Sequence, residues 1–320
     1  RGVAHLVGAR LHVVDELCEV PGREVRRRGH EEHRRVGKPG DDLPTSKPHL
    51  FDVAGKKEIP VDDKLFPTPW SIDRVHWLPD SSRCLFLYNQ RGHQLMRVLS
   101  VTAGSGEVVA LVDEQCKTFF CYSSKQFLQQ LPATKELIWM SERDGWNHLY
   151  LYGASNGKVK NQITRGGWIV RKVERVDEQN RQIWFTAGGI RDGQDPYFIH
   201  YCRVNFDGSG LVILTEGDGT HTAEFSPDQR FFVDTFSRVD MPPIHELRRA
   251  EDGKLLCELE HADCSELLNT GWRAPERFVR RQDPEHLAIL ADDLSFSLPS
   301  DAPDPPEFAA LASEFADVLG

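Results

Sequence analysis

The sequence predicts an all-β fold, a partial β-propeller of about four four-stranded antiparallel blades. Four segments of similar make-up follow one another at a period of about 50 residues, and each is a series of short strands rich in aromatic and β-branched side chains. Each segment also carries a glycine-containing turn at the same place, between its third and fourth strands. A β-sandwich is the alternative, but it does not explain why this turn recurs in every repeat.

The strands of the four repeats can be assigned in chain order. In the first repeat they lie at 75–80, 84–88, 95–101 and 108–112; in the second at 137–140, 148–152 and 159–164; in the third at 175–177, 182–185, 198–204 and 211–215; and in the fourth at 224–228, 231–235, 244–248 and 255–259. The recurring turns are Gly104-Ser105-Gly106, Ser155-Asn156-Gly157, Asp207-Gly208-Ser209-Gly210 and Asp252-Gly253. Short strands joined in this way make up-and-down antiparallel sheets.

The two ends of the chain differ from the repeats. Residues 1–37 are rich in arginine and poor in large apolar residues after Val14, so we expect little fixed structure there. Residues 38–279 carry the propeller blades, and 280–320 a linker and a short tail. The tail is expected to form an amphipathic helix from Pro306, with its apolar face made by Phe308, Leu311, Phe315 and Val318.

The composition argues against two classes of partner. The formal net charge is -10 and the sequence pI is about 5.7, so the surface repels phosphate backbones and anionic lipids. We expect no nucleic-acid partner and no membrane partner. The chain contains neither a run of about 18 apolar residues nor a signal-peptide pattern. We therefore expect a soluble protein, whose compartment (cytoplasm, periplasm or cell exterior) the sequence leaves open.

The seven cysteines are scattered, odd in number and without a C-x-x-C pair. Most have apolar neighbours, as in Leu255-Leu256-Cys257, which favours small buried thiols over a disulfide framework or a zinc site. We predict neither a metal nor a cofactor.

Residues Gly153-Ala154-Ser155-Asn156-Gly157 match G-x-S-x-G, the pattern around the nucleophile of serine hydrolases. Such a serine needs a strand before it and a helix after it. Here the following residues, 158–164, alternate between polar and apolar side chains, which is a strand pattern. We therefore predict a hairpin turn, in which Asn156-Gly157 supplies the positive φ angles of a type I′ turn, and no catalytic role for Ser155.

Other residues that could carry chemistry have plainer interpretations. His30 and His33 lack a third metal ligand nearby. Four histidines in or beside strands have no consistent Asp or Ser partner in the sequence and are interpreted as core or surface residues: His200, His221, His245 and His261. Five tryptophans recur through the repeats, as packing between blades requires: Trp77, Trp139, Trp146, Trp168 and Trp184. We assign no catalytic, cofactor-binding or metal-binding residue, and the substrate-binding residues stay unknown.

Several segments, in the same order, resemble the propeller of dipeptidyl peptidase IV-like serine peptidases of the prolyl oligopeptidase family. They are Ser141-Glu142-Arg143-Asp144-Gly145-Trp146-Asn147-His148-Leu149-Tyr150-Leu151-Tyr152, Gly193-Gln194-Asp195-Pro196-Tyr197-Phe198, Asn205-Phe206-Asp207-Gly208-Ser209-Gly210, and Phe225-Ser226-Pro227-Asp228 through Ser237-Arg238-Val239-Asp240-Met241-Pro242-Pro243. The resemblance runs from about Lys38 to about Phe278.

The resemblance implies a propeller that caps a C-terminal α/β-hydrolase domain, the two together removing dipeptides from peptide N-termini. In that family the hydrolase domain supplies the Ser, Asp and His, and two adjacent propeller glutamates bind the α-amino group of the substrate. We expect both to lie outside this chain, because the resemblance ends after Val279 and begins partway through the propeller. Glu31-Glu32 lacks the aromatic strand context of that pair and is interpreted as a solvated charge run.

The sequence thus predicts the substrate-gating and docking part of a dipeptidyl peptidase IV-like serine peptidase, inactive by itself. Its expected partners are an α/β-hydrolase domain, missing or on another chain, and peptide substrates once the two are assembled. A homodimer is a further option. The alternative function is a free-standing β-propeller interaction module without peptidase activity.

Overall fold

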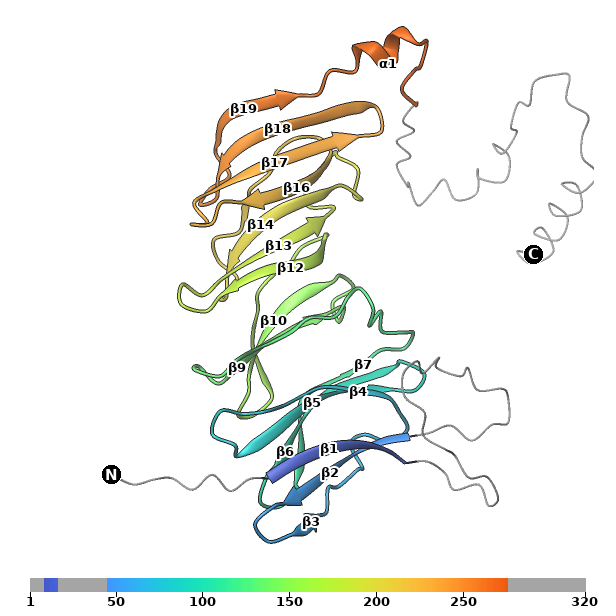
Figure 1. Ribbon diagram of the computed structural model, residues 1–320, viewed down its shortest axis with the longest axis vertical. Coiled ribbons are helices and arrows are strands. Elements are labelled where there is room, and N and C mark those ends of the chain that lie inside the picture. The colour runs from blue at the N-terminus through green and yellow to red at the C-terminus, as the bar shows by residue number, and fades with distance from the viewer. Residues whose placement is uncertain (1–8, 17–44, 276–320) are drawn as a thin grey trace, which may run out of the picture. The chain divides into compact units, whose positions relative to one another are not determined.

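A computed structural model describes residues 9–16 and 45–275 of the protein (Figure 1). Every regular element in these residues is a β-strand, apart from one short helix. The strands form five sheets, one with three strands and four with four, and in each sheet strands that follow one another in the chain pair antiparallel. The predicted partial β-propeller with four four-stranded sheets is therefore confirmed.

The three-stranded sheet comes first in the chain and contains β1 (Ala9–Glu16), β2 (Thr45–Asp52) and β3 (Lys57–Ile59). Strand β1 lies in the segment for which the sequence predicted little fixed structure, so the structure differs from that expectation for residues 9–16. The reason is a short β-prone stretch, Leu11-His12-Val13-Val14, which pairs with β2 along its whole length.

The four four-stranded sheets follow, and we number them first to fourth in chain order. The first contains β4 (Pro69–Trp77), β5 (Arg83–Gln90), β6 (Leu95–Thr102) and β7 (Val108–Gln115). The second contains β8 (Leu128–Leu131), β9 (Glu136–Ser141), β10 (His148–Gly153) and β11 (Lys158–Gln162). The third contains β12 (Ile169–Asp177), β13 (Gln182–Gly188), β14 (Ile199–Asn205) and β15 (Val212–Ile213). The fourth contains β16 (Thr220–Phe225), β17 (Phe231–Arg238), β18 (Met241–Arg249) and β19 (Leu255–His261), and the helix α1 (Ser265–Asn269) follows it.

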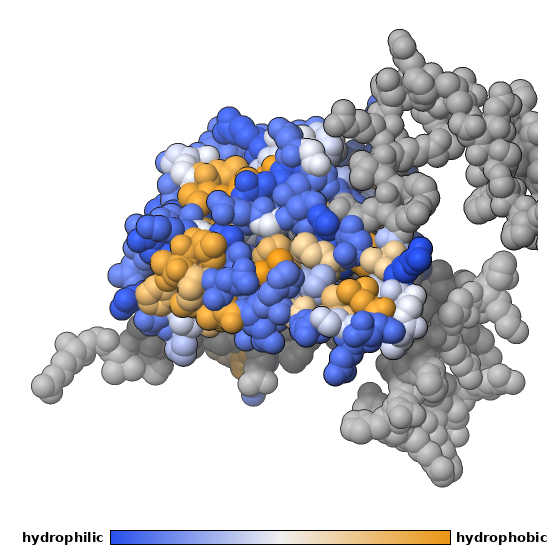
Figure 2. All heavy atoms as spheres, turned by 90° about the horizontal axis from the view of Figure 1, so that it is seen from above, coloured by the Kyte–Doolittle hydropathy of each residue, from blue (hydrophilic) through white to orange (hydrophobic). Residues whose placement is uncertain are grey.

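The burial pattern of the second strand shows whether each sheet is covered on one face or on both. Strands β5, β9 and β13 are buried almost without interruption, because a neighbouring sheet lies against each face. Strand β17 instead alternates, with Phe232 and Phe236 buried against the third sheet and Phe231 and Val233 half-exposed on the far face. Figure 2 looks onto the end of the molecule where the fourth sheet lies and shows apolar side chains gathered in patches between hydrophilic ones.

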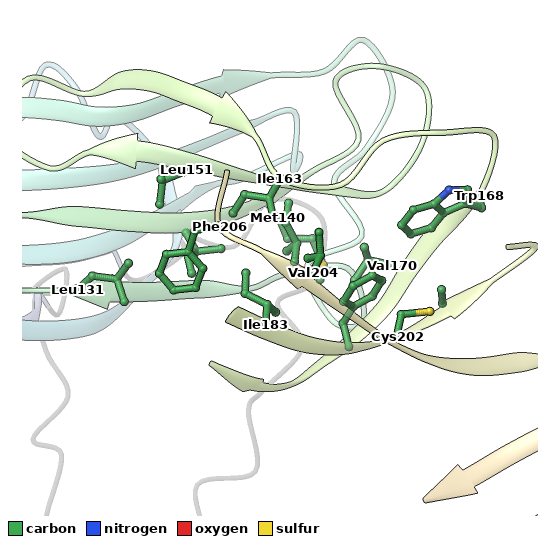
Figure 3. Packing of buried hydrophobic residues seen from close by; sticks show 14 residues of the cluster. Leu131, Met140, Leu151, Ile163, Trp168, Val170, Ile183, Cys202, Val204 and Phe206 are labelled. Atoms are coloured by element: carbon green, nitrogen blue, oxygen red, sulfur yellow. The ribbon is translucent and has the colours of Figure 1, made fainter. Parts of the chain in front are cut away.

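The largest apolar cluster joins the second and third sheets (Figure 3). It includes Ile138 and Leu151 from the second sheet and Phe185 and Val204 from the third, all of them almost completely buried. Burial of each such side chain contributes roughly 1.5–3 kcal/mol to folding. Similar clusters join the first sheet to the second and the third to the fourth, so the core consists of the layers between successive sheets.

The tryptophans mostly pack between sheets, as predicted. Trp139, Trp168 and Trp184 are buried, and Trp77 is half-buried. The prediction is wrong for Trp146, which is 44% exposed because it lies in the connection between β9 and β10 rather than in a strand.

The six described cysteines are free thiols. Cys84 and Cys202 are buried, as predicted, and burial raises the pKa of the Cys84 thiol to about 11. Cys257 is exposed, so the expectation of a buried thiol is wrong there. The physical reason is its place in β19, the last strand of the fourth sheet, in which every residue is exposed.

Several predictions concern residues outside the described part of the chain. These are the arginine-rich centre with His30, Glu31-Glu32 and His33, the linker, and the helix expected from Pro306. Among the residues that are described, no helix is long and apolar enough to cross a membrane.

Candidate functional site at the loop end of the sheets

The up-and-down topology places the connections of each sheet at two opposite ends of its strands. The turn end carries the connections between first and second and between third and fourth strands: 78–82, 103–107, 132–135, 154–157, 178–181, 206–211, 226–230 and 250–254. The loop end carries the connections between second and third strands and those that lead to the next sheet: 91–94, 116–127, 142–147, 163–168, 189–198, 214–219 and 239–240. Function usually depends on connections, so the two ends are the places to search.

At the turn end, one glycine with a positive φ angle recurs in the connection between third and fourth strands of all four sheets. A Cβ atom there would run into a backbone carbonyl of the preceding sheet. The distance from the added Cβ to the carbonyl oxygen would be 2.0 Å between Gly106 and Pro60, 2.9 Å between Gly157 and Ala110, 3.0 Å between Gly208 and Gln162, and 2.4 Å between Gly253 and Leu214. The repeated turns are therefore packing contacts between successive sheets.

Ser155 lies in one of these turns, between β10 and β11, and the predicted hairpin is confirmed. The type I′ geometry is wrong, because only Gly157, with φ 65°, lies in the left-handed region, whereas Asn156 does not. The amide of Gly157 donates to the carbonyl of Gly153 at 2.9 Å, which closes a longer turn. No histidine among the described residues hydrogen-bonds to Ser155. That Ser155 has no catalytic role stays a prediction.

At the loop end, a buried carboxylate ties the first sheet to the second. Glu114 of β7 is only 7% exposed and accepts hydrogen bonds from Trp139 Nε1 at 2.6 Å, from Arg143 Nη2 at 2.9 Å and from the hydroxyl of Ser141. Burial acts to lower the pKa of Arg143, but Glu114 and Tyr152 raise it on balance. A buried carboxylate is stable only with such donors, and two of the three, Ser141 and Arg143, lie in the segment that resembles the peptidase propellers.

An aromatic cluster lies at the loop end of the first sheet. The ring of His93 stacks on Tyr122 with centroids 4.5 Å apart and meets Trp70 at 5.0 Å and Phe119 at 5.4 Å. Trp70 is 43% exposed and Phe119 53%, and Arg91 lies over the Trp70 ring. Exposed aromatic side chains with an arginine are enriched where proteins bind partners. This cluster could not be predicted from the sequence, because its members come from two separate connections, 91–94 and 116–127, and from the start of β4.

Two buried histidines at the loop end have the same structural role in successive sheets. His148 Nδ1 lies 3.0 Å from the hydroxyl of Thr164, and His200 Nδ1 lies 3.2 Å from that of Thr215. Burial lowers the pKa of His148, and burial together with the nearby His221 lowers that of His200 to about 4. The interpretation of His200 as a core residue is confirmed.

His221 has an acidic partner that the sequence analysis did not find. Its Nδ1 lies 2.8 Å from Asp234 Oδ1, both side chains are fully buried, and Arg248 Nε lies 3.4 Å from Asp234 Oδ2. The pairing of β16 with β17 brings the two side chains together on one face of the sheet. His221 Nε2, the nitrogen that would have to activate a nucleophile, lies 2.8 Å from the carbonyl of Gly217 instead. This His–Asp pair therefore holds the fold.

The other two histidines are half-buried or exposed. His245 Nδ1 bonds to the hydroxyl of Thr235 at 2.8 Å, and His261 is exposed at the end of β19. Within the part of the chain that the structure describes, no group of three or more His, Cys, Asp or Glu side chains could hold a metal ion.

Successive antiparallel four-stranded sheets, with a repeated turn end and a variable loop end, define this protein as a partial β-propeller. The family model described as the dipeptidyl peptidase IV (DPP IV) N-terminal region matches residues 25–243, and the chain belongs to this family. The matched range begins and ends earlier in the chain than the range 38–279 that the sequence predicts for the propeller.

Known relatives and solved structures agree with this assignment. Dipeptidyl peptidase 4 of Arthroderma otae and that of Trichophyton rubrum are each 23% identical to this chain over 217 residues, which is 66% of this chain and 27% of theirs. The crystal structure of Porphyromonas gingivalis dipeptidyl peptidase 4 matches 73% of this chain and 32% of its own, with a TM-score of 0.55 and 22% identity. A putative dipeptidyl aminopeptidase IV from Bacteroides ovatus matches 70% and 34%, with a TM-score of 0.50 and 21% identity. The chain thus spans about a quarter of the length of the relatives it matches, and the solved structures share its fold.

Proposed function

We propose that this chain is the propeller part of a dipeptidyl peptidase IV-like serine peptidase, which docks a hydrolase domain, gates the access of peptides to it and has no peptidase activity alone. The family match over residues 25–243 is the observation that carries the proposal. The described residues add support, because their buried histidines hydrogen-bond to threonine, aspartate and backbone groups rather than to a nucleophilic serine.

The far face of the fourth sheet supports a place within a larger assembly. In strand β17 the half-exposed Phe231, Val233 and Thr235 occupy the positions that the neighbouring sheet buries in β13. An uncovered sheet face of this kind favours a further sheet packed against it. The loop end is the expected contact region for peptides or the hydrolase domain, since it carries the exposed aromatic side chains Trp70 and Phe119.

Peptidase activity of the purified chain tests the proposed inactivity. With glycyl-prolyl-p-nitroanilide as substrate, we expect no release of p-nitroaniline above a buffer control, and the same result for Ser155→Ala. Cleavage by the wild-type chain that disappears in Ser155→Ala would show that this chain is a complete hydrolase and would overturn the proposal.

A free-standing module that pairs through its fourth sheet is the second candidate, and the uncovered far face favours it as well. Sedimentation of the chain separates the two candidates. A defined dimer that Val233→Lys dissociates would support the module, whereas a monomer would support the peptidase part. Gln179→Lys is the matched control, because it adds the same charge in an exposed connection at the turn end.

A further inference from the structure

We propose that a cavity between the third and fourth sheets, at the turn end, binds the carboxylate group of a ligand. The cavity has a volume of about 480 Å³ and is lined by residues of β13 and β14 on one side and by the connections around β17 and β18 on the other. Its polar lining is dominated by arginine, with Arg203, Arg230 and Arg249. The cavity lies at the turn end, away from the loop end that is the expected contact region for peptides or the hydrolase domain, so the inference goes beyond the proposed function.

An equivalent cavity of about 400 Å³ lies between the second and third sheets and serves as the internal comparison. The backbone shows that the two are built from matching positions. Phe206 donates its amide to the carbonyl of Arg181 at 2.9 Å, and Ala250 donates its amide to the carbonyl of Arg230 at 2.9 Å. Glu136 and Gln182 likewise each begin the second strand of their sheet.

The cavity between the second and third sheets contains its own carboxylate. Glu136 is 3% exposed and accepts hydrogen bonds from Arg181 Nη1 at 2.8 Å and from Lys160 Nζ. Burial raises the pKa of this carboxyl, but the bonds from Arg181 and Lys160 outweigh it and lower the pKa to about 2. The cations that line this cavity are therefore neutralised by the chain itself.

Three matching positions differ in the cavity between the third and fourth sheets. Gln182 replaces the carboxylate of Glu136, and Ala250 stands where Phe206 fills the other cavity. Arg203 takes the position that Leu151 has in the other cavity. Glu136 pairs with Gly153 and Gln182 pairs with Asn205, and Leu151 and Arg203 each lie two residues before that pairing residue. Together these differences remove an anion, add a cation and make room, which is the change that an acidic ligand requires.

Two hydrogen-bond donors in this cavity have no partner among the residues that the structure describes. The Trp184 residue is only 7% exposed, and its Nε1 makes no hydrogen bond. The Nε of Arg203 is also buried and makes no hydrogen bond. The two residues pair directly across β13 and β14, so both line the cavity from the same sheet. A buried donor without a partner costs about 1–3 kcal/mol, and a carboxylate accepts from an indole N–H and a guanidinium together. A carboxylate bound between these two residues would accept from both donors.

Of the three arginines that line the cavity, Arg230 and Arg249 lie near carboxylates and Arg203 makes no ion pair within the described residues, while Arg175 lies over the Trp184 ring, 3.6 Å from its centroid. Arg249 is hydrogen-bonded to Asp252, and Arg230 lies 3.8 Å from Asp228. Glu251 also lines the cavity and lies exposed to solvent. Arg230 and Arg249 thus draw an anion to the entrance, while Arg203 and Trp184 hold it.

Isothermal titration calorimetry of the whole chain tests the proposal with two carboxylate sources. The first probe is succinate, and the second is the blocked peptide acetyl-Gly-Glu-Gly-amide, with acetyl-Gly-Gln-Gly-amide as its neutral counterpart. We expect one site per chain for at least one acidic probe. Arg203→Leu, which copies Leu151, should weaken binding at least about 10-fold. Gln182→Glu should do the same, because it restores the internal carboxylate, and should also raise the unfolding temperature.

Arg165→Leu is the control, since it removes one positive charge outside the cavity. It should change the affinity less than about twofold. Binding of succinate alone would identify a site for small free anions, and binding of the glutamyl peptide alone a site for acidic side chains. The proposal is overturned if neither acidic probe binds, if the glutaminyl peptide binds as well as the glutamyl one, or if Arg203→Leu, folded by circular dichroism, retains the wild-type affinity.

Discussion

The four sheets repeat one another at the turn end but differ at the loop end. Each connection between third and fourth strands places a left-handed glycine against a carbonyl of the sheet before it. The loop-end connections instead range from two residues, 239–240, to the long segment 116–127, and each carries different side chains. The difference indicates that repeated backbone contacts at the turn end fix the spacing of the sheets, whereas side-chain contacts at the loop end differ from one sheet to the next.

The largest expected effect comes from filling a turn-end contact. In Gly106→Ala the new Cβ would lie 2.0 Å from the carbonyl oxygen of Pro60, at a φ of 70°. Strain from the left-handed backbone and overpacking each cost on the order of 1–3 kcal/mol, so we expect a loss of about 3–5 kcal/mol in the free energy of unfolding. Urea denaturation followed by circular dichroism measures this loss.

Gly92→Ala is the matched variant at the loop end. Gly92 has a φ of 98°, yet a Cβ there meets nothing within 4 Å. Only the backbone strain applies, and we expect a loss of about 1–2 kcal/mol. Equal losses in the two variants would contradict the claim that the turn end, rather than backbone conformation alone, holds the sheets together.

The next effect is a pH dependence that originates at the loop end. Burial, with the nearby His221, lowers the pKa of His200 from 6.5 to about 4. Between pH 6.5 and 4 the unfolded chain therefore binds a proton that the folded chain does not, so the free energy of unfolding falls as the pH falls through this window. The contribution is at most about 3 kcal/mol. His200→Gln should flatten the dependence, measured by urea denaturation at several pH values. An unchanged slope would show that His200 titrates normally in the folded protein.

An ion pair at the turn end should give a smaller loss. Glu136→Gln removes the charge that holds Arg181 and Lys160. Breaking a fully buried pair costs about 3–5 kcal/mol, but both cations are substantially exposed, so we expect about 2 kcal/mol. The loss should disappear near pH 2, where the wild-type carboxyl becomes protonated as well. Lys158→Gln, which removes an exposed charge from the same hairpin, should cost less than about 0.5 kcal/mol. A loss that persists at pH 2 would exclude the ion pair as its cause.

The same contrast explains what could be predicted from the sequence. The strands and the turn-end glycines could be predicted, because short β-prone segments and glycine-containing turns are local patterns that the repeat displays four times. The contacts of Glu114 with Arg143 and of His221 with Asp234 could not, since they depend on which strands and sheets lie side by side. Strand β8 was missed for a similar reason: its Gln129-Gln130 centre has no strand pattern and is held by pairing with β9.

The smallest effect on stability is expected for the exposed aromatic cluster at the loop end. About half of the Phe119 side chain is already in solvent, so Phe119→Ala should reduce the free energy of unfolding by less than about 1 kcal/mol. Phe185→Ala is the control: Phe185 is fully buried and stacks on Trp168 with centroids 5.8 Å apart, and its loss should cost about 3–5 kcal/mol. Urea denaturation compares them. A loss in Phe119→Ala as large as that in Phe185→Ala would mean that the aromatic cluster holds the fold, and would remove the reason for expecting partners there; a small loss leaves its exposed rings available for binding.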